Sequence, residues 1–266
     1  MFDALFTTTT EYKKLSHALS GKGACALFGL PASGRAQVYA ALCRQLDKPL
    51  CIVTPGEAEA TRFAADLNTL GIPAAVFPAR DYVLRPIEGT AREYEYRRLA
   101  VLGELVGGRL RAVAVPAEAL TQFTTPKEDF CANTRTLHAG DTLLRDDLLA
   151  ALFGAGYTRR AQVDGPGQFS VRGDIVDIFA PDQKMPVRME FWGDEIDTLH
   201  TFDLTTQRRE DAIDKFYLSP AREVLFGKPA DAAEQLRTFL AKQRGKKKTA
   251  MADLSLIHIS EPTRRS

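Results

Sequence analysis

The chain has 266 residues, of which 45% are hydrophobic and 26% are charged, and its formal net charge at pH 7 is +1. This composition is typical of a soluble globular protein with one large domain or two modest ones. A net charge so close to zero gives no electrostatic reason to expect the whole module to bind nucleic acid. No apolar stretch approaches the length of a membrane span, and the acidic Asp3 near the N-terminus is unlike a signal peptide.

Alternating strand and helix signals fill the first half of the chain. Short apolar runs predict strands at residues 24–30, 49–54, 74–77 and 111–115, and apolar residues at helical spacing predict helices at 35–46, 57–70 and 90–106. Gly71 stands where the second of these helices needs a C-terminal cap. Continuous apolar strands separated by helices are typical of a parallel sheet covered on both faces, so we expect an α/β domain over residues 1–133.

The next region has the pattern of an antiparallel α+β domain, which we expect over residues 134–219. A short strand is predicted at 135–139, a short helix at 145–153, and further strands at 169–172 and 175–179. Gly173 interrupts the alternation between the last two strands, which indicates a bulge or a turn. After residue 218 the chain is expected to return into the first domain and to form a helix at about 231–242.

Residues 187–192 alternate with a period of two, as a half-buried strand does. Its apolar face carries Val187, Met189 and Phe191, and its polar face carries Arg188, Glu190 and Trp192. Tryptophan and arginine together on an exposed face are typical of protein–protein hot spots. Arg188 and Trp192 are therefore candidate interface residues, and their truncation should leave folding nearly unaffected. The alternative is that a neighbouring domain covers Trp192.

The four cysteines, Cys25, Cys43, Cys51 and Cys131, are scattered along the chain. Their spacing fits neither a zinc site nor a disulfide framework, so we expect no bound metal. Three of the cysteines lie in apolar runs, which predicts buried free thiols in a reducing compartment.

The block around residues 187–192 resembles the domain shared by the excision-repair protein UvrB and the transcription-repair coupling factors. The residues that carry the resemblance are, in order, 167–169, 171–179, 186–188, 190–196, 202–203 and 206–208. A run this long in fixed order is far more specific than a short phosphate-loop motif. The resemblance covers roughly residues 10–245 and implies a degenerate P-loop (RecA-like) parallel-sheet domain with the antiparallel α+β domain inserted into it.

A phosphate loop is expected where the first strand meets its helix, but its chemistry is incomplete. Gly29 and Gly34 have the spacing of Gly-x-x-x-x-Gly-Lys-Ser/Thr, so the loop and the helix N-terminus retain some means to attract an anion. Arg35 stands in place of the lysine that reaches the β- and γ-phosphates, and Ala36 replaces the hydroxyl that binds Mg²⁺. We therefore predict no ATP hydrolysis and no cofactor for this chain.

This loss separates two members of the resembled family. UvrB keeps an intact phosphate loop and carries a long, aromatic-rich β-hairpin after the third strand. The corresponding segment here, residues 81–92, is short and mostly polar. The chain therefore looks like the N-terminal UvrB-homology region of a transcription-repair coupling factor (Mfd). The alternative is a divergent UvrB-like, ATP-dependent DNA-binding excinuclease subunit.

The resemblance implies a recruitment module rather than an enzyme. In the family, the domain corresponding to residues 134–219 binds UvrA and so brings excision repair to a lesion at a stalled RNA polymerase. The UvrA-contacting positions of the family correspond here to Arg172, Arg188 and Trp192. We therefore expect a monomer in the bacterial cytoplasm that has UvrA as its partner and makes no membrane contact.

The family also implies a much longer protein, whose other parts bind RNA polymerase and move along double-stranded DNA with ATP and Mg²⁺. Residues 220–250 are expected to return into the first domain, as a truncated part of it. Residues 251–266 depart from the family, and from Leu254 onward they resemble the translation of a sequencing-library adaptor. We expect this end to be an assembly artefact joined to a truncated gene.

Overall fold

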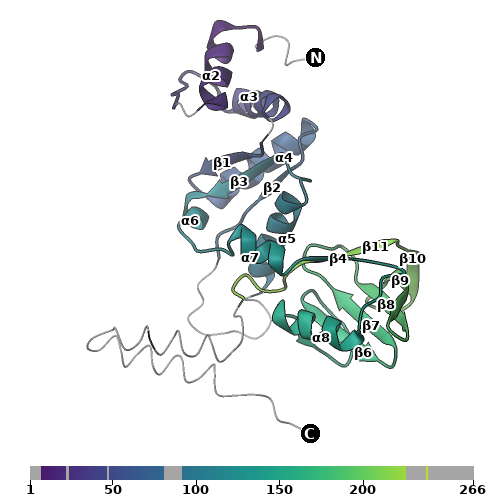
Figure 1. Cartoon of the computed structure of the whole chain (residues 1–266). Helices are drawn as coiled ribbons and strands as arrows, with labels where there is room; N and C mark the ends of the chain where they lie inside the picture. The colour runs from purple at the N-terminus through teal and green to yellow at the C-terminus, as the bar shows by residue number, and fades with distance from the viewer. Residues whose placement is uncertain (1–6, 22–23, 47, 81–91, 226–237, 239–266) are drawn as a thin grey trace. The chain divides into compact units, whose positions relative to one another are not determined.

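The structure is a computed structural model that describes residues 7–21, 24–46, 48–80, 92–225 and 238 (Figure 1). The chain divides into two compact units, Met1–Glu223 and Val224–Ser266, and nearly all described residues belong to the first. The helix predicted at 231–242 and the end at 251–266 lie outside the described residues, as does nearly all of the 81–92 segment.

A three-stranded parallel sheet is the centre of the first region (Figure 1). β1 (Leu50–Thr54) and β2 (Ala74–Val76) both pair in parallel with β3 (Ala112–Pro116), which lies between them. All five residues of β3 are buried, as expected of a strand that is covered on both faces. The predicted parallel sheet is confirmed, and the three strands begin and end within one residue of their predicted bounds.

Two helices, α4 (Glu57–Thr69) and α5 (Glu93–Val106), cover opposite faces of β3. α4 packs Phe63 and Leu67 in one core cluster with Ala112 and Ala114, whereas Val101 of α5 packs in another cluster with Val113 and Val115. Alternate residues of a strand point to opposite faces, so these two clusters lie on different sides of the sheet. The predicted cover on both faces is therefore confirmed for β3, whereas β1 leaves Cys51 and Val53 exposed on one side.

Gly71 ends α4 as predicted. Its φ of 74° lies in the left-handed region that favours glycine. The amide of Gly71 donates to the Asn68 carbonyl (3.0 Å) and the amide of Ile72 donates to the Leu67 carbonyl (2.9 Å). This pair of hydrogen bonds satisfies the carbonyl groups of the last helical turn.

The segment at residues 24–30, between α2 (Thr10–Ser20) and α3 (Ala32–Gln45), is not a strand. It is irregular and exposed at nearly every position, and Phe28 is 89% exposed. An apolar run becomes a strand only where a neighbouring strand supplies hydrogen bonds, and none of the described strands pairs with this segment. The predicted first strand is therefore wrong in this structure.

The cysteines do not share the burial that their apolar neighbours predicted. Cys43 on α3 is buried, and burial raises the pKa of its thiol. Cys25 and Cys51 are exposed, so the prediction of buried thiols is wrong for them; Cys131, which does not lie in an apolar run, is exposed as well. Cys51 illustrates the reason: it lies in an apolar strand but on the exposed side of β1.

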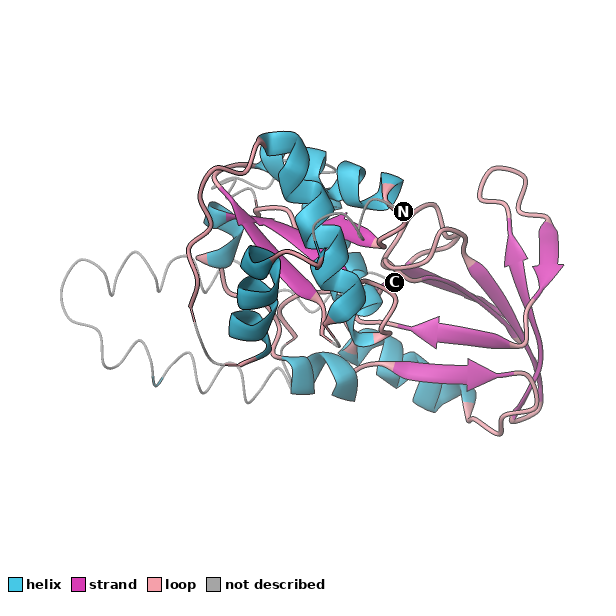
Figure 2. Ribbon diagram, turned by 90° about the horizontal axis from the view of Figure 1, so that it is seen from above, coloured by secondary structure: helices cyan, strands magenta, loops and turns pink. Residues whose placement is uncertain are grey.

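The second region contains a six-stranded sheet in the order β10-β9-β8-β7-β6-β5 and a separate two-stranded sheet of β4 and β11. Figure 2 shows the strands of the protein in magenta. The strands of the six-stranded sheet are β5 (Thr158–Arg159), β6 (Gln168–Arg172), β7 (Ile175–Phe179), β8 (Val187–Trp192), β9 (Glu195–Phe202) and β10 (Arg209–Ala212). Only β5 and β6 are parallel; the other neighbours in this sheet are antiparallel. β4 (Arg135–His138) also pairs antiparallel with β11 (Lys215–Leu218). The predicted antiparallel α+β region is confirmed.

One face of this sheet packs against α8 (Arg145–Gly154) (Figure 1). Leu148 and Leu152 of α8 are fully buried in a cluster with Phe169, Val176 and Met189. Two short helices, α6 (Ala117–Leu120) and α7 (Lys127–Ala132), lie between the two regions in sequence. Among the described helices, none combines the length and apolar character that crossing a bilayer requires.

Candidate protein-interaction face

The alternation predicted for β8 is present in the structure. Val187, Met189 and Phe191 are at most 6% exposed, which places this face of the strand in the core. On the other face, Trp192 is 82% exposed. No element within the described ranges covers Trp192, so its predicted exposure is confirmed. We refer to the side of the sheet that carries Arg188, Glu190 and Trp192 as the polar face.

The strand register arranges the polar face in rows. One row contains Ser170, Asp177, Arg188 and His200, which are paired across β6, β7, β8 and β9. The next row, nearer the Gly173 turn, contains Arg172, Ile175, Glu190 and Thr198. Trp192 lies two residues beyond Glu190. Paired residues have their Cβ atoms about 4.5–5.5 Å apart, so the side chains in each row contact their neighbours.

Asp177 is the buried centre of the first row, with a side chain that is 0% exposed. Arg188 donates from Nε to Oδ1 (2.7 Å) and from Nη2 to Oδ2 (3.0 Å). Arg172 donates from Nη2 to Oδ2 at 2.6 Å, and the Ser170 hydroxyl lies 3.5 Å from the same oxygen. A buried carboxylate needs such donors, because an unpaired charge in the interior is very unfavourable.

Arg188 is more enclosed than its position on the strand predicted. Its side chain is 11% exposed, and its guanidinium carbon lies 4.7 Å from the centre of the Phe202 ring. Nη1 also donates to the Gln207 carbonyl at 3.2 Å. Strand parity places Arg188 on the polar face correctly, but the expectation of an exposed side chain is wrong. Arg188 is enclosed because it pairs with the buried Asp177 on the neighbouring strand and because the loop with Gln207 covers its guanidinium.

Burial decreases along the polar face toward Trp192. At the far end, a small apolar cluster of Val163, Phe179 and Phe202, with Leu204 packed against it, covers the sheet. At the other end, the side chains of Arg172 and Trp192 are 48% and 82% exposed. We refer to this part, with Arg172, Ile175, Glu190 and Trp192, as the open end of the polar face. Arg209 pairs with Glu190 there.

The loop at residues 203–208 holds the covered end in place. Asp203 accepts hydrogen bonds from the amides of Thr206 (2.7 Å) and Thr205 (3.1 Å), which lower the pKa of its carboxyl group. Gln207 has a φ of 59°, and its side-chain amide donates to the Leu204 carbonyl at 2.8 Å. This conformation points the Gln207 carbonyl at Arg188. The loop therefore encloses the Arg188 guanidinium through the Gln207 carbonyl.

Two residues that hold Arg188 in place on the polar face were not predicted from the sequence, Asp177 and Gln207. Asp177 had a visible signal, because a single carboxylate in the apolar strand Ile175–Phe179 is costly unless arginines pair with it. Gln207 gave no such signal in the sequence, since it binds Arg188 through its backbone carbonyl and not through its side chain. The structure does bring Arg172, Arg188 and Trp192 onto one face, as the resemblance implies.

The residues of the degenerate phosphate loop lie at the start of α3. Gly29 has a φ of 77° and precedes the helix, whereas Gly34, Arg35 and Ala36 are inside it. The amides of Gly34 and Arg35 both donate to the Pro31 carbonyl (2.9 and 3.2 Å), so the helix uses them. Ala36 is 4% exposed, and Arg35 Nη1 lies 3.8 Å from Glu59 Oε1. The amides of Gly34 and Arg35 are thus engaged within the first turn of α3.

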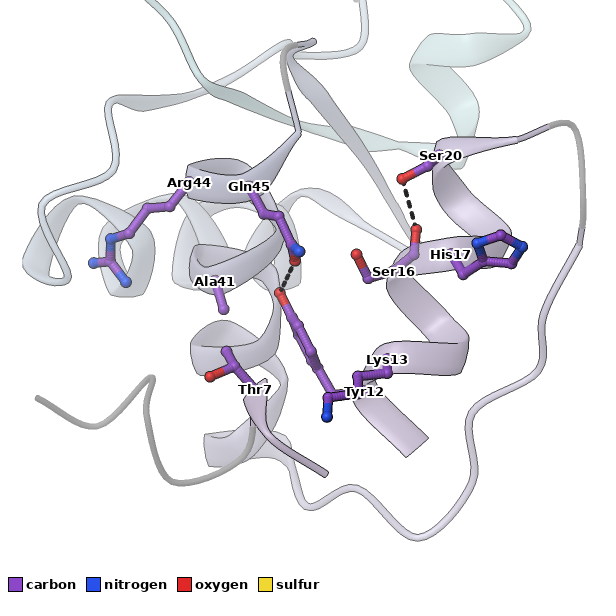
Figure 3. A pocket seen from close by; sticks show the side chains of 9 residues that line it. All are labelled: Thr7, Tyr12, Lys13, Ser16, His17, Ser20, Ala41, Arg44 and Gln45. Carbon is purple, nitrogen blue, oxygen red and sulfur yellow. Dashed lines mark hydrogen bonds between the residues drawn. The ribbon is translucent and has the colours of Figure 1, made fainter. Parts of the chain in front are cut away.

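A cavity of about 540 Å³ lies between α2 and α3 (Figure 3). Its lining includes Lys13 and His17 from α2 and Arg44 from α3. The Tyr12 hydroxyl donates to Gln45 Oε1 at 3.0 Å in its middle. Figure 3 shows Arg44 and His17 pointing to opposite sides of Tyr12. The basic side chains do not converge on one position, so the cavity indicates no particular ligand.

Comparison with known proteins agrees with the geometry of the second region. Residues 136–224 match the family model of the UvrB interaction domain. This part of the chain belongs to the UvrB interaction domain family. The UvrB interaction domain thus contains the whole polar face, with Arg172, Asp177, Arg188 and Trp192.

Over most of its length the chain is also similar to transcription-repair-coupling factors. It is 35% identical over 208 residues to that of Myxococcus xanthus, which is 74% of this chain and 17% of the relative. It is 38% identical over 192 residues to that of Mycobacterium bovis (69% and 15%), and 28% identical over 212 residues to that of Bacillus subtilis (79% and 18%). The chain therefore spans less than a fifth of the length of these relatives.

Proposed function

We propose that this chain is the UvrA-recruiting part of a transcription-repair-coupling factor, and that its UvrB interaction domain binds UvrA through the open end of the polar face. The observation that carries the proposal is Trp192, a large aromatic side chain that is 82% exposed on the same face as Arg172 and Arg188, in a region that matches the UvrB interaction domain. An exposed tryptophan of this kind is the residue type that most often dominates protein–protein binding energy.

The rest of the proposed role belongs to a longer protein. We propose that contacts with RNA polymerase, movement on double-stranded DNA and hydrolysis of ATP with Mg²⁺ reside in other parts of the transcription-repair-coupling factor, in the bacterial cytoplasm. For this chain we propose no enzymatic activity, which is supported by Arg35 and by the buried Ala36 in α3. The chain then contributes recognition only.

The test is a titration of purified UvrA against this chain. Wild type should bind saturably, and Trp192→Ala should bind more weakly. Phe123→Ala is the matched control, because Phe123 is 94% exposed but lies outside the UvrB interaction domain. The proposal is wrong if wild type does not bind UvrA, or if Trp192→Ala and Phe123→Ala bind equally well.

A further inference from the structure

We infer that Asp177 is a positioning residue for partner binding: its buried carboxylate holds the guanidinium of Arg172 in one orientation at the open end of the polar face, where Arg172 meets a carboxylate of the partner protein. The inference rests on the proposed function and names the chemistry of that interface. Asp177 itself is 0% exposed and does not reach the partner.

Asp177 is held rigidly enough to act in this way. Arg188 engages both of its oxygens, and Arg188 is itself fixed by the Gln207 carbonyl and the Phe202 ring. The carboxylate also sits on the central strand β7, between β6 and β8. Its position is therefore set by the core of the domain and not by the surface.

Arg172 receives its orientation from this carboxylate. It is the last residue of β6, its side chain is 48% exposed, and it donates one nitrogen, Nη2, to Asp177 Oδ2 at 2.6 Å. A free arginine side chain loses much conformational freedom when it binds, and one that is already held loses less. A guanidinium has five N–H donors, so the Asp177 contact leaves donors of Arg172 for a partner.

The free donors of Arg172 favour an anionic group on the partner. Within this part of the polar face three arginines (Arg172, Arg188 and Arg209) face three carboxylates, Asp177, Glu190 and Glu195, the last of which is paired with Trp192 across β8 and β9. Glu190 pairs with Arg209, and Arg188 engages both oxygens of Asp177, so Arg172 is the arginine that is bound through one nitrogen only and is half-exposed. A planar guanidinium recognises a carboxylate or a phosphate through two parallel hydrogen bonds. The exposed Trp192 on the same face and the net chain charge of +1 favour a protein carboxylate over nucleic-acid phosphates.

The experiment is a double-mutant cycle on UvrA binding by this chain, with Asp177→Asn, Arg172→Ala and the double variant. Affinities are corrected for the folded fraction, which is measured by thermal melting. We expect Asp177→Asn to weaken binding at least about tenfold, and the double variant to bind within about twofold of Arg172→Ala. Ser170→Ala, which removes the longer contact to the same carboxylate, is the control and should change affinity less than about twofold. Independent, additive losses would overturn the inference.

Arg172→Lys tests the inferred role of the Arg172 guanidinium even if Asp177→Asn does not fold. This variant keeps the charge on an exposed side chain but loses the planar fork, so binding should weaken at least about fivefold at an unchanged melting temperature. Wild-type affinity in Arg172→Lys would overturn the inference and leave the proposed UvrA binding intact. Duplex DNA is added as a competitor and should not displace UvrA; displacement would show that Arg172 binds phosphate instead.

Discussion

Arg98 and Glu223 lie 125 residues apart in the sequence and form an ion pair in which both side chains are 0% exposed. Arg98 donates from Nη2 and Nε to Oε1 of Glu223 at 2.8 and 2.9 Å, and from Nε to Oε2 at 3.0 Å. Arg80 reaches the same carboxylate at 2.5 Å, and the Phe77 ring lies under the Arg98 guanidinium. The pair connects α5 to Glu223, the last residue of the first unit, which follows β11 by a short segment.

Removal of one charge from this pair should destabilise the protein strongly. We expect Glu223→Gln to lower the free energy of unfolding by about 3–5 kcal/mol, because it leaves the buried Arg98 without its counter-charge. Glu104→Gln is the control. Glu104 lies on α5, as Arg98 does, but its partner Arg109 is 44% exposed, so the loss of unfolding free energy should stay below about 1 kcal/mol. Urea unfolding measures the free energy of unfolding of both variants. Equal losses would contradict the expectation that the buried Arg98–Glu223 pair matters more for stability than the exposed pair.

The same carboxylate predicts how stability depends on pH. Burial acts to raise the pKa of Glu223, but hydrogen bonds from Arg98 and its other neighbours outweigh it, so the pKa lies below its ordinary value of 4.5. A lowered pKa stabilises the folded state fully above that ordinary value, and this contribution disappears as the pH falls through the folded-state pKa. The difference in unfolding free energy between wild type and Glu223→Gln should therefore be constant at neutral pH and shrink below about pH 4.5. A difference in unfolding free energy that persists at acidic pH would contradict a lowered pKa of Glu223 in the folded state.

The two faces of β8 should respond oppositely to truncation. Met189→Ala removes a fully buried side chain and should cost about 2–5 kcal/mol of stability through the cavity it leaves. Trp192→Ala should change stability by less than about 0.5 kcal/mol, yet weaken UvrA binding by about 2 kcal/mol or more. Melting curves and UvrA titrations separate the two effects. A Trp192→Ala variant that unfolds but binds normally per folded molecule would make Trp192 a core residue.

Arg188 should prove structural as well as functional. Its side chain is 11% exposed and pairs with the buried Asp177, so Arg188→Ala should cost about 3 kcal/mol or more of stability. Arg172→Ala, at 48% exposure and on the same carboxylate, should cost less than about 1 kcal/mol. Chemical denaturation of the two variants is the measurement. If both are equally stable, Asp177 does not depend on Arg188 in the way that the contacts indicate.

Nucleotide should have no effect on this chain. We expect no phosphate release from ATP with Mg²⁺, and a change in melting temperature below about 1 °C, because a ligand that does not bind cannot stabilise the folded state. Arg35→Lys with Ala36→Thr should not restore turnover, since residue 36 is buried in α3 and a hydroxyl there does not face a ligand. Turnover by the unmodified chain would contradict the proposed absence of activity.

Several features were decided by the sequence alone, because they depend on local pattern. The parallel sheet followed from continuous apolar runs between amphipathic helices, and Gly71 was recognised as the cap of α4. The period of two in Val187–Trp192 separated the core face of β8 from the face with Trp192. The long signature identified the UvrB interaction domain without any structural information.

Other features were decided only by the tertiary structure, because they depend on which distant residues meet. The apolar run at 24–30 had the composition of a strand but no described strand to pair with, so it is irregular. Parity placed Arg188 on the correct face but did not reveal the burial that Asp177, Phe202 and the Gln207 carbonyl impose. Local periodicity shows which way a side chain points, whereas its exposure and its charge partner are set by segments that only folding brings together.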